Sequence, residues 1–132
     1  MILVDTNVLM YAAGAEHPHK APSVAFLERV ASGEIDAVID AEVLQEILHR
    51  YRALDRWGDA LRVFDLARTI FPVVLPVTEE ALVRAAALLD AHPRLMARDG
   101  VHAAVALENG LDGICSFDTD FDVIDALERI AP

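Results

Sequence analysis

The stretch Ile2-Leu3-Val4-Asp5-Thr6-Asn7 decides the fold class of this chain. Three consecutive apolar residues ahead of an acid are typical of a short strand that is buried on both faces of a parallel sheet. Residues 6–13 then continue as a helical segment. In parallel sheets flanked by helices, binding and catalytic groups lie beyond the carboxyl ends of the strands, so Asp5 is the first candidate functional residue. The competing interpretation of Asp5 is a helix N-cap.

The rest of the chain alternates short apolar runs with amphipathic segments. We expect strands at residues 37–39, 73–77 and 113–116, and helices at residues 23–31, 41–54, 59–70, 78–91 and 99–108. Residues 16–22 and 117–121 are expected as loops, residues 124–130 as a short terminal element, and Trp57-Gly58 as the turn of a helical hairpin. Pro76 places its strand at an edge or an end. The alternation predicts a central, mainly parallel sheet of four to five strands with helices on both faces, in one domain over residues 1–132.

Composition narrows the functional classes. The chain has 132 residues, 55% of them hydrophobic, and a net charge of −11. A protein that coats nucleic acid by counterion release is basic, so this charge argues against broad nucleic-acid binding. The negative charge does not exclude an enzyme that binds phosphate through metal ions held by its carboxylates. The single cysteine, Cys115, excludes an internal disulfide and favours a reducing cytoplasm. With neither a signal peptide nor an apolar run near the ~20 residues that span a bilayer, we expect a cytoplasmic protein without membrane association.

Further acids stand where the expected elements would bring them to the same edge of the sheet. Asp118 comes two residues after the strand at 113–116, and Asp120 and Asp122 follow at spacings of two. A calcium loop is excluded, because Val123 stands where its glycine is required and Arg129 where its bidentate acid is required. The alternative to a functional site is an Asp-rich turn.

Two of the expected helices each carry one more candidate acid. Glu46 lies among apolar residues with Arg50 four residues on, a spacing that also suits a surface ion pair. Asp99 opens its helix, where a first-turn acid is common. His102, one turn later, is expected to be a packed or surface histidine rather than a ligand. Together the acids form a cluster without a Cys/His set, and such hard oxygen ligands select Mg²⁺ or Mn²⁺ over zinc.

Four blocks of the sequence, taken in order, resemble the PIN domain, the nuclease fold of the VapC toxins. They are Ile2-Leu-Val-Asp5-Thr-Asn-Val-Leu9, Glu42-Val-Leu-Gln-Glu46-Ile-Leu, Arg98-Asp99-Gly-Val-His-Ala-Ala-Val-Ala106 and Ile114-Cys-Ser-Phe-Asp118-Thr-Asp-Phe121. The resemblance covers essentially the whole chain and implies a three-layer α/β/α sandwich. Two positions depart from the family pattern. Gly100 stands where alanine or a larger apolar residue is usual, which predicts a looser helix start, and Ser116 stands where threonine is commonest.

The resemblance also implies the site and its chemistry. The acids of the family fall on Asp5, Glu46, Asp99 and Asp118, with Asp120 as a fifth candidate, while the supporting positions fall on Thr6, Asn7 and Ser116. The implied activity is metal-dependent endoribonuclease cleavage with Mg²⁺ or Mn²⁺, leaving 5′-phosphate and 3′-hydroxyl ends. Single-stranded or looped RNA is the expected target. The candidates for contacting its backbone are arginines, with Arg50 and Arg98 first and then Arg52, Arg56 and Arg94.

A VapB-type antitoxin is the partner that the resemblance implies. The hairpin expected at residues 41–70 is rich in Val, Leu, Ile and Phe and contains Trp57. Such a surface fits an amphipathic antitoxin segment or a symmetric homodimer, and it also fits ordinary core packing.

Other classes of protein fit less well. A haloacid-dehalogenase-like phosphatase requires a second aspartate where Asn7 stands and an active-site lysine, whereas the single lysine, Lys20, lies in an expected loop. A response-regulator receiver domain fails on the same lysine and on the missing acid pair. Two alternatives stay open: a PIN nuclease of RNA maturation that is not a toxin, and a non-catalytic PIN module that binds metal and RNA.

Overall fold

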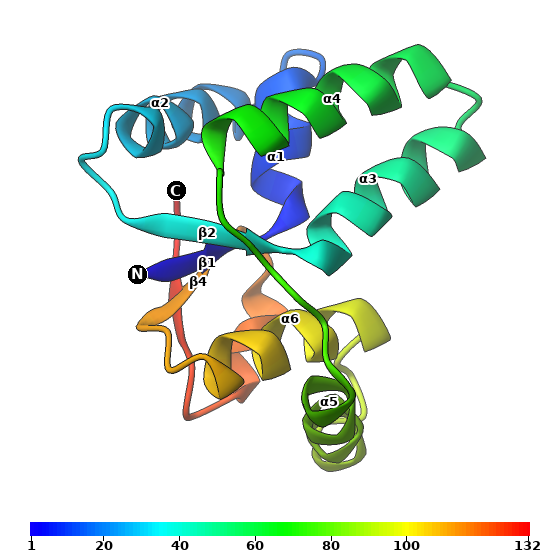
Figure 1. Cartoon of the computed structure of the whole chain (residues 1–132), viewed down its shortest axis with the longest axis vertical. Coiled ribbons are helices and arrows are strands. Elements are labelled where there is room, and N and C mark those ends of the chain that lie inside the picture. The colour runs from blue at the N-terminus through cyan, green and yellow to red at the C-terminus, as the bar shows by residue number, and fades with distance from the viewer.

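A five-stranded, all-parallel sheet forms the centre of the computed structural model, which describes all 132 residues (Figure 1). Its order is β3-β2-β1-β4-β5. The strands are β1 (Ile2–Val4), β2 (Ala37–Asp40), β3 (Val74–Leu75), β4 (Gly113–Cys115) and β5 (Glu128–Ile130). The expected parallel sheet is confirmed, and the short terminal element supplies its fifth strand.

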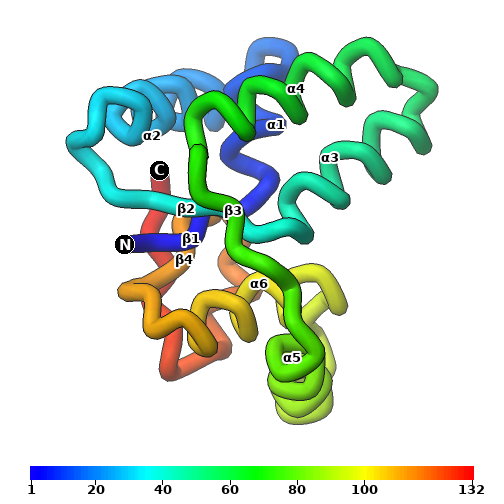
Figure 2. The backbone as a smooth tube through the Cα atoms, in the orientation of Figure 1, coloured from blue at the N-terminus to red at the C-terminus, as the bar shows by residue number.

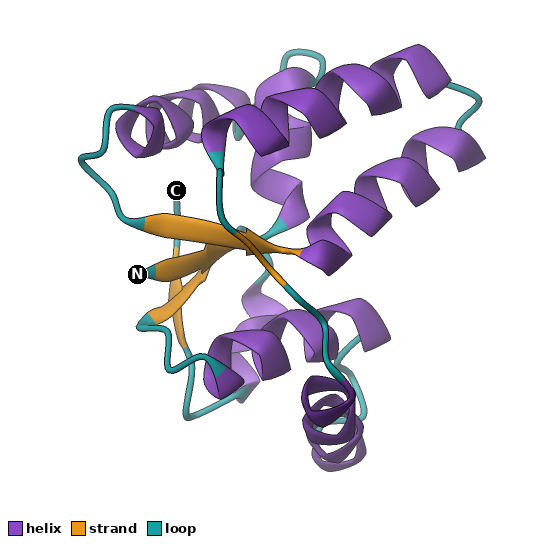
Figure 3. Ribbon diagram, in the orientation of Figure 1, coloured by secondary structure: helices purple, strands orange, loops and turns teal.

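Helices cover both faces of this sheet, as the alternation of elements predicts (Figure 3). One face carries α1 (Thr6–Ala13), α2 (Lys20–Ala31), α3 (Ala41–Ala53) and α4 (Trp57–Ile70), and the other carries α5 (Glu79–Ala91) and α6 (Ala97–Glu108). Successive strand residues point to opposite faces. Val4 therefore joins the apolar cluster under α1–α4, whereas Leu3 joins the cluster under α6. None of the helices is long and apolar enough to cross a membrane.

The order of the strands creates a switch point between β1 and β4. The chain moves outward from β1 through β2 to β3, then returns to the other side of β1 to form β4 and β5. Figure 2 follows this path: α3 and α4 connect β2 to β3, and α5 and α6 lead the chain back to β4. In open parallel sheets, a crevice forms at the carboxyl ends of the two strands that flank such a point. Asp5 and Ser116, which directly follow β1 and β4, therefore lie at this crevice.

Three helices, α2, α4 and α6, begin earlier than the sequence predicts. The α2 helix starts at Lys20, because Pro22 lies in its first turn, where a missing backbone N–H costs no helical hydrogen bond. The α4 helix starts at Trp57, so Trp57-Gly58 is not the turn of the hairpin. That turn lies at residues 54–56, where Asp55 has a φ of +55°, a value that aspartate tolerates better than most residues.

The bounds of β3, of α5 and of the loop after β4 also differ by a few residues from the prediction. The strand expected at 73–77 shortens to β3, at an edge of the sheet as Pro76 indicates. Thr78 caps α5 by accepting a hydrogen bond from the backbone N–H of Ala81. The loop expected at 117–121 contains a short 3-10 helix over Thr119–Val123.

Gly100 does not loosen the start of α6. The helix begins at Ala97, two residues earlier than expected, and Gly100 is buried. A Cβ atom at this position would lie 2.8 Å from the Cγ and Cδ2 atoms of Leu89 on α5. The glycine therefore lets the two helices pack closely, and the looser start that the family comparison predicted is wrong.

Replacing Gly113 with alanine is expected to destabilise the fold by about 1–3 kcal/mol. A Cβ atom there would lie 2.4 Å from the backbone oxygen of Glu128, so β4 and β5 would have to separate. The matched control is Gly58→Ala in α4, where a Cβ atom meets nothing within 4 Å. Urea unfolding of both variants measures the difference. Equal stability of the two variants would contradict this account of the β4–β5 pair.

Candidate functional site

Four acids from four parts of the chain line one cavity at the switch point. Asp5 follows β1, Glu46 lies on α3, Asp99 lies in the first turn of α6, and Asp118 follows β4. The cavity has a volume of about 180 Å³, and its other lining residues are Asn7, Met10, Arg50, Met96 and Arg98. The structure therefore brings together the four acids that the sequence singles out. Asp120 is exposed and does not line the cavity.

Ser116 connects the residues that follow β1 and β4. Its hydroxyl donates a hydrogen bond of 2.6 Å to Asp5 Oδ2. Ser116 Oγ also accepts hydrogen bonds from the side-chain amide of Asn7, at 3.0 Å, and from the backbone N–H of Asp118, at 2.9 Å. Asp5 occupies the N-cap position of α1, but its side chain makes no capping hydrogen bond. The carboxylate instead lines the cavity, so Asp5 holds the N-cap position without capping the helix through its side chain.

Two arginines stand at the rim of the cavity beside Glu46. The Arg50 and Arg98 Nη1 atoms lie 4.0 Å and 3.8 Å from Glu46 Oε1. The other arginine candidates lie outside the cavity lining. Arg52 lies over the Trp57 ring, Arg56 pairs with Asp59, and Arg94 lines a different hollow beside Val123.

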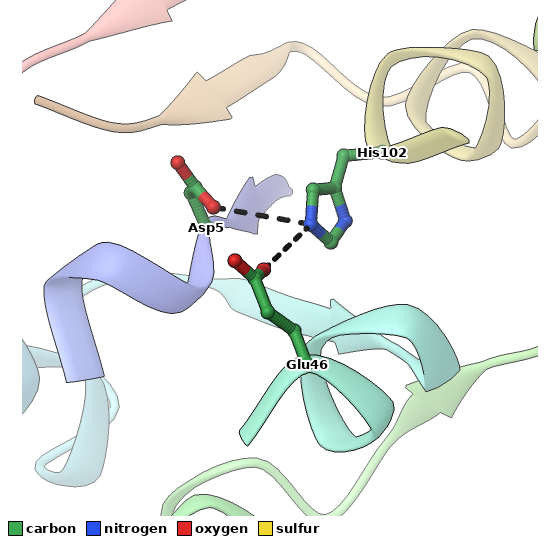
Figure 4. A group of neighbouring side chains, drawn as sticks. All are labelled: Asp5, Glu46 and His102. Carbon is green, nitrogen blue, oxygen red and sulfur yellow. Dashed lines mark ion pairs between the residues drawn. The ribbon is translucent and has the colours of Figure 1, made fainter. Parts of the chain in front are cut away.

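A buried pair beneath the acids is the feature that sequence reasoning missed. His102 and Asp40 are both fully buried, and His102 Nδ1 lies 2.8 Å from Asp40 Oδ2. The expectation of a packed histidine is confirmed, but the ring also faces the site. Its Nε2 atom lies 3.9 Å from Asp5 Oδ1 and 3.7 Å from Glu46 Oε2 (Figure 4). Asp40 ends an apolar strand just as Asp5 does, and that signal could have revealed it.

Crowding and burial shift the ionisation of these groups. Burial, followed by the nearby charges of Asp5 and Asp118, raises the pKa of Asp99 to about 7. Burial also raises the pKa of Asp5. Burial opposes the ionisation of Glu46, but the polar groups of His102 and Thr6 outweigh it and lower the pKa of Glu46.

The pKa of His102 is raised well above its ordinary value. Burial alone would lower it, but the surrounding carboxylates of Asp40, Glu46 and Asp5 outweigh burial. The carboxylates of the site therefore favour a positively charged group beside them.

The residues fit a divalent metal ion on three counts. Two groups of side chains each bring their ligand atoms within 4.8 Å of one another: Asp5 with Glu46 and His102, and Asp99 with Asp118 and Asp120. Carboxylate oxygens are the ligands that hard divalent cations prefer. The buried side-chain polar atoms that lack a hydrogen-bond partner also all lie at this site; they are Thr6 Oγ1, Asn7 Oδ1 and His102 Nε2. Buried polar groups are rarely left unpaired without a reason, and a ligand supplies one here.

Comparisons with known proteins agree with this fold and this cluster of acids. The family model of the PIN domain matches residues 2–127. The ribonuclease VapC13 of Mycobacterium tuberculosis is 40% identical over 131 residues, which cover 99% of this chain and 100% of that protein. The ribonuclease VapC23 of the same organism is 36% identical over 118 residues, covering 89% of this chain and 93% of that protein.

A solved structure supports the same fold. VapC20 of M. tuberculosis, described as a toxin that cleaves the sarcin-ricin loop, superposes with a TM-score of 0.80 at 19% identity, over 100% of both chains. The chain therefore belongs to the PIN domain family, among its VapC ribonucleases.

Proposed function

We propose that this chain hydrolyses RNA phosphodiester bonds at the cavity lined by Asp5, Glu46, Asp99 and Asp118, and that it is the toxin of a toxin–antitoxin pair. The observation that carries the proposal is the gathering of four carboxylates in one small cavity, in or beside which three buried polar atoms lack partners. A bound Mg²⁺ or Mn²⁺ ion would supply a water activated for attack and would neutralise charge on the phosphate. The expected products carry 5′-phosphate and 3′-hydroxyl ends.

The side chains divide this work among them. Asp5 and Asp118 are positioned through Ser116, and we assign them to metal binding with Glu46. Asp99, with its pKa raised to about 7, suits a group that orients the attacking water and takes up its proton near neutral pH. Arg50 and Arg98 at the rim suit the phosphates on either side of the scissile bond.

An aromatic group beside the cavity supports a single-stranded substrate. The rings of Tyr11, His17, His19 and Phe117 contact one another, with His19 stacked on Phe117 at 3.9 Å between ring centroids. A second hollow of about 220 Å³, lined by Asn7, Met10, Tyr11 and Arg50, shares three of these residues with the acidic cavity. Unpaired bases stack on aromatic rings. Stacking itself does not require positive charge, which is scarce in this chain.

Replacing Tyr11 with alanine is expected to raise the KM for single-stranded RNA about 10-fold and to leave kcat nearly unchanged. Stacking on an aromatic side chain contributes about 1–3 kcal/mol per base. Tyr11→Phe keeps the ring and should retain the wild-type KM. Steady-state cleavage of a short labelled RNA measures both constants. An unchanged KM in Tyr11→Ala would remove Tyr11 from the substrate path.

We assign an antitoxin partner on the basis of the family and of the exposed apolar surface. VapBC2 of Rickettsia felis, solved with a DNA fragment from its promoter, has the same fold, with a TM-score of 0.77 at 16% identity over 99% of this chain and 98% of that one. In this chain the α3–α4 hairpin leaves apolar side chains exposed, namely Leu54, Trp57, Leu61 and Leu66. An amphipathic segment or a second copy of the chain would cover such residues.

The proposed mode of inhibition is an antitoxin arginine that enters the acidic cavity and competes with metal. A truncated antitoxin without its C-terminal segment should bind but fail to inhibit. Full inhibition by the truncated antitoxin would contradict this mode. Finding a gene for a small DNA-binding protein directly upstream would favour a toxin over an RNA-maturation enzyme.

The activity itself is tested with structured and unstructured RNAs in Mg²⁺, Mn²⁺ or EDTA. Cleavage should require metal and should disappear in Asp5→Asn. The matched control is Asp125→Asn, an exposed acid outside the cavity lining, which should cleave like the wild type. Cleavage that persists in Asp5→Asn would overturn the assignment. A folded protein that binds metal and RNA without cleaving would instead support the non-catalytic module.

A further inference from the structure

The Nε2 atom of His102 faces Asp5 and Glu46 without forming a hydrogen bond. The side chain is fully buried, yet Nε2 has no hydrogen-bond partner. Its nearest polar neighbours are carboxylate oxygens of Asp5 and Glu46, at 3.9 Å and 3.7 Å (Figure 4). Both distances are too long for hydrogen bonds. An unpaired polar atom in such a position is costly unless a ligand occupies the space between the three groups.

Carboxylate oxygens and imidazole nitrogens bind divalent transition metals at about 2.0–2.2 Å, so neighbouring ligands of one ion lie about 3–3.6 Å apart. The separations here are a few tenths of an ångström longer, so small side-chain shifts would bring the three groups onto one ion. The three side chains come from different elements: Asp5 follows β1, Glu46 lies on α3 and His102 on α6. All three are held by the packed core of the protein, so the ligand atoms are already gathered.

Asp40 fixes the orientation of the His102 ring. Asp40 Oδ2 accepts the hydrogen bond from Nδ1–H at 2.8 Å, so Nε2 is the ring nitrogen that faces Asp5 and Glu46 and that would bind a metal ion once its proton is lost. The second oxygen of Asp40 accepts from the backbone N–H of Val43 at 2.9 Å, so the carboxylate is held at both ends. A carboxylate behind a histidine is the arrangement that orients most metal-binding histidines in proteins.

We propose that His102 Nε2 is a metal ligand and that it forms, with Asp5 and Glu46, an inner cation position selective for Mn²⁺ over Mg²⁺. Imidazole nitrogen favours transition metals, whereas Mg²⁺ favours oxygen and retains its waters. Metal binding displaces the proton from Nε2 into solvent. The neighbouring group of Asp99, Asp118 and Asp120 offers only carboxylate oxygens and no nitrogen ligand. The inference deepens the proposed function, because it names the inner ligands of the same site.

Pulsed electron paramagnetic resonance of the protein with one equivalent of Mn²⁺ tests the inference directly. The wild-type spectrum should show ¹⁴N coupling from one coordinated imidazole. His102→Gln should lose this coupling and bind Mn²⁺ at least 10-fold more weakly by calorimetry, while its affinity for Mg²⁺ changes less than 3-fold. The matched control is His49→Gln, on the exposed side of α3, which should keep the coupling.

The wild-type spectrum decides the question even where the His102 variant fails to fold. Absence of ¹⁴N coupling in wild-type protein with bound Mn²⁺ would overturn the inference, as would equal weakening of Mg²⁺ and Mn²⁺ binding in a folded His102→Gln. The proposed function is scored separately by RNA cleavage. Cleavage without ¹⁴N coupling would leave the nuclease standing and remove His102 from its metal site, whereas coupling without cleavage would do the reverse.

Discussion

Replacing Asp99 with asparagine is expected to make the metal-free protein more stable and to lower RNA cleavage about 100-fold or more. The carboxyl of Asp99 is partly buried beside Asp5 and Asp118, and its ionisation is costly enough to raise its pKa to about 7. A pKa difference of one unit corresponds to about 1.4 kcal/mol. Allowing for screening by solvent at the open cavity, the neutral amide should stabilise the fold by about 1–3 kcal/mol.

The gain in stability should depend on pH in a direction that identifies its cause. The pKa of Asp99 is raised on folding, so this group favours the folded state most at low pH and loses that contribution as pH rises from about 4 through about 7. The difference in unfolding free energy between Asp99→Asn and wild type should therefore be small near pH 4 and largest near pH 8. Urea unfolding in EDTA across this range measures it.

Two controls separate strain from catalysis in this experiment. Mg²⁺ or Mn²⁺ binds the folded wild type, so saturating metal should reduce or reverse the advantage of the variant. The exposed variant Asp125→Asn should show no such pH-dependent gain. A variant at position 99 that is less stable than wild type at pH 8 would show that Asp99 is a structural residue and not a strained functional one.

The second large effect is expected at Asp40, the last residue of β2. Asp40→Ala should destabilise the protein by about 3–5 kcal/mol, because it leaves the fully buried His102 without its partner and also removes the cap of α3. Loss of a cap alone costs about 1 kcal/mol, and Thr78→Ala at the start of α5 measures that share.

Asp40→Asn distinguishes the two roles of this side chain. Asparagine caps helices as well as aspartate does, but as an amide it holds the His102 ring less firmly. Its stability should fall between those of wild type and Asp40→Ala, as read from chemical unfolding. If Asp40→Ala costs no more than Thr78→Ala, the buried pair contributes nothing beyond capping.

The order of the elements and four acids of the site could be predicted because each depends on local patterns. An apolar run that ends in a polar residue marks a strand and its carboxyl end, and this pattern predicted that Asp5 and Asp118 lie at the edge of the sheet where the cavity is found. Glu46 and Asp99 followed from the family pattern on their helices. The carboxyl ends of parallel strands lie at one edge of the sheet, whatever the sequences of the connecting helices, so residues that follow different strands come together there.

The rest of the site depends on contacts between distant parts of the chain. Asp40 and His102 are 62 residues apart, and nothing in either local sequence shows that they pair. The close packing at Gly100 depends on Leu89 in the same way. The predicted starts of α2 and α4 were wrong for a local reason. Proline and glycine usually indicate loops, but Pro22 and Gly58 lie in the first turns of these helices, where both residue types are tolerated.

The most direct test of the central claim is the rate of RNA cleavage by protein stripped of metal with EDTA and then titrated with Mn²⁺. The proposed site predicts no cleavage before the titration and a saturable return of activity, with half-saturation near the dissociation constant for Mn²⁺ measured by calorimetry. Asp99→Asn should recover no activity over the same range. Cleavage by the stripped wild-type protein, or full recovery in Asp99→Asn, would contradict the claim that this acidic cavity is the site of a metal-dependent ribonuclease.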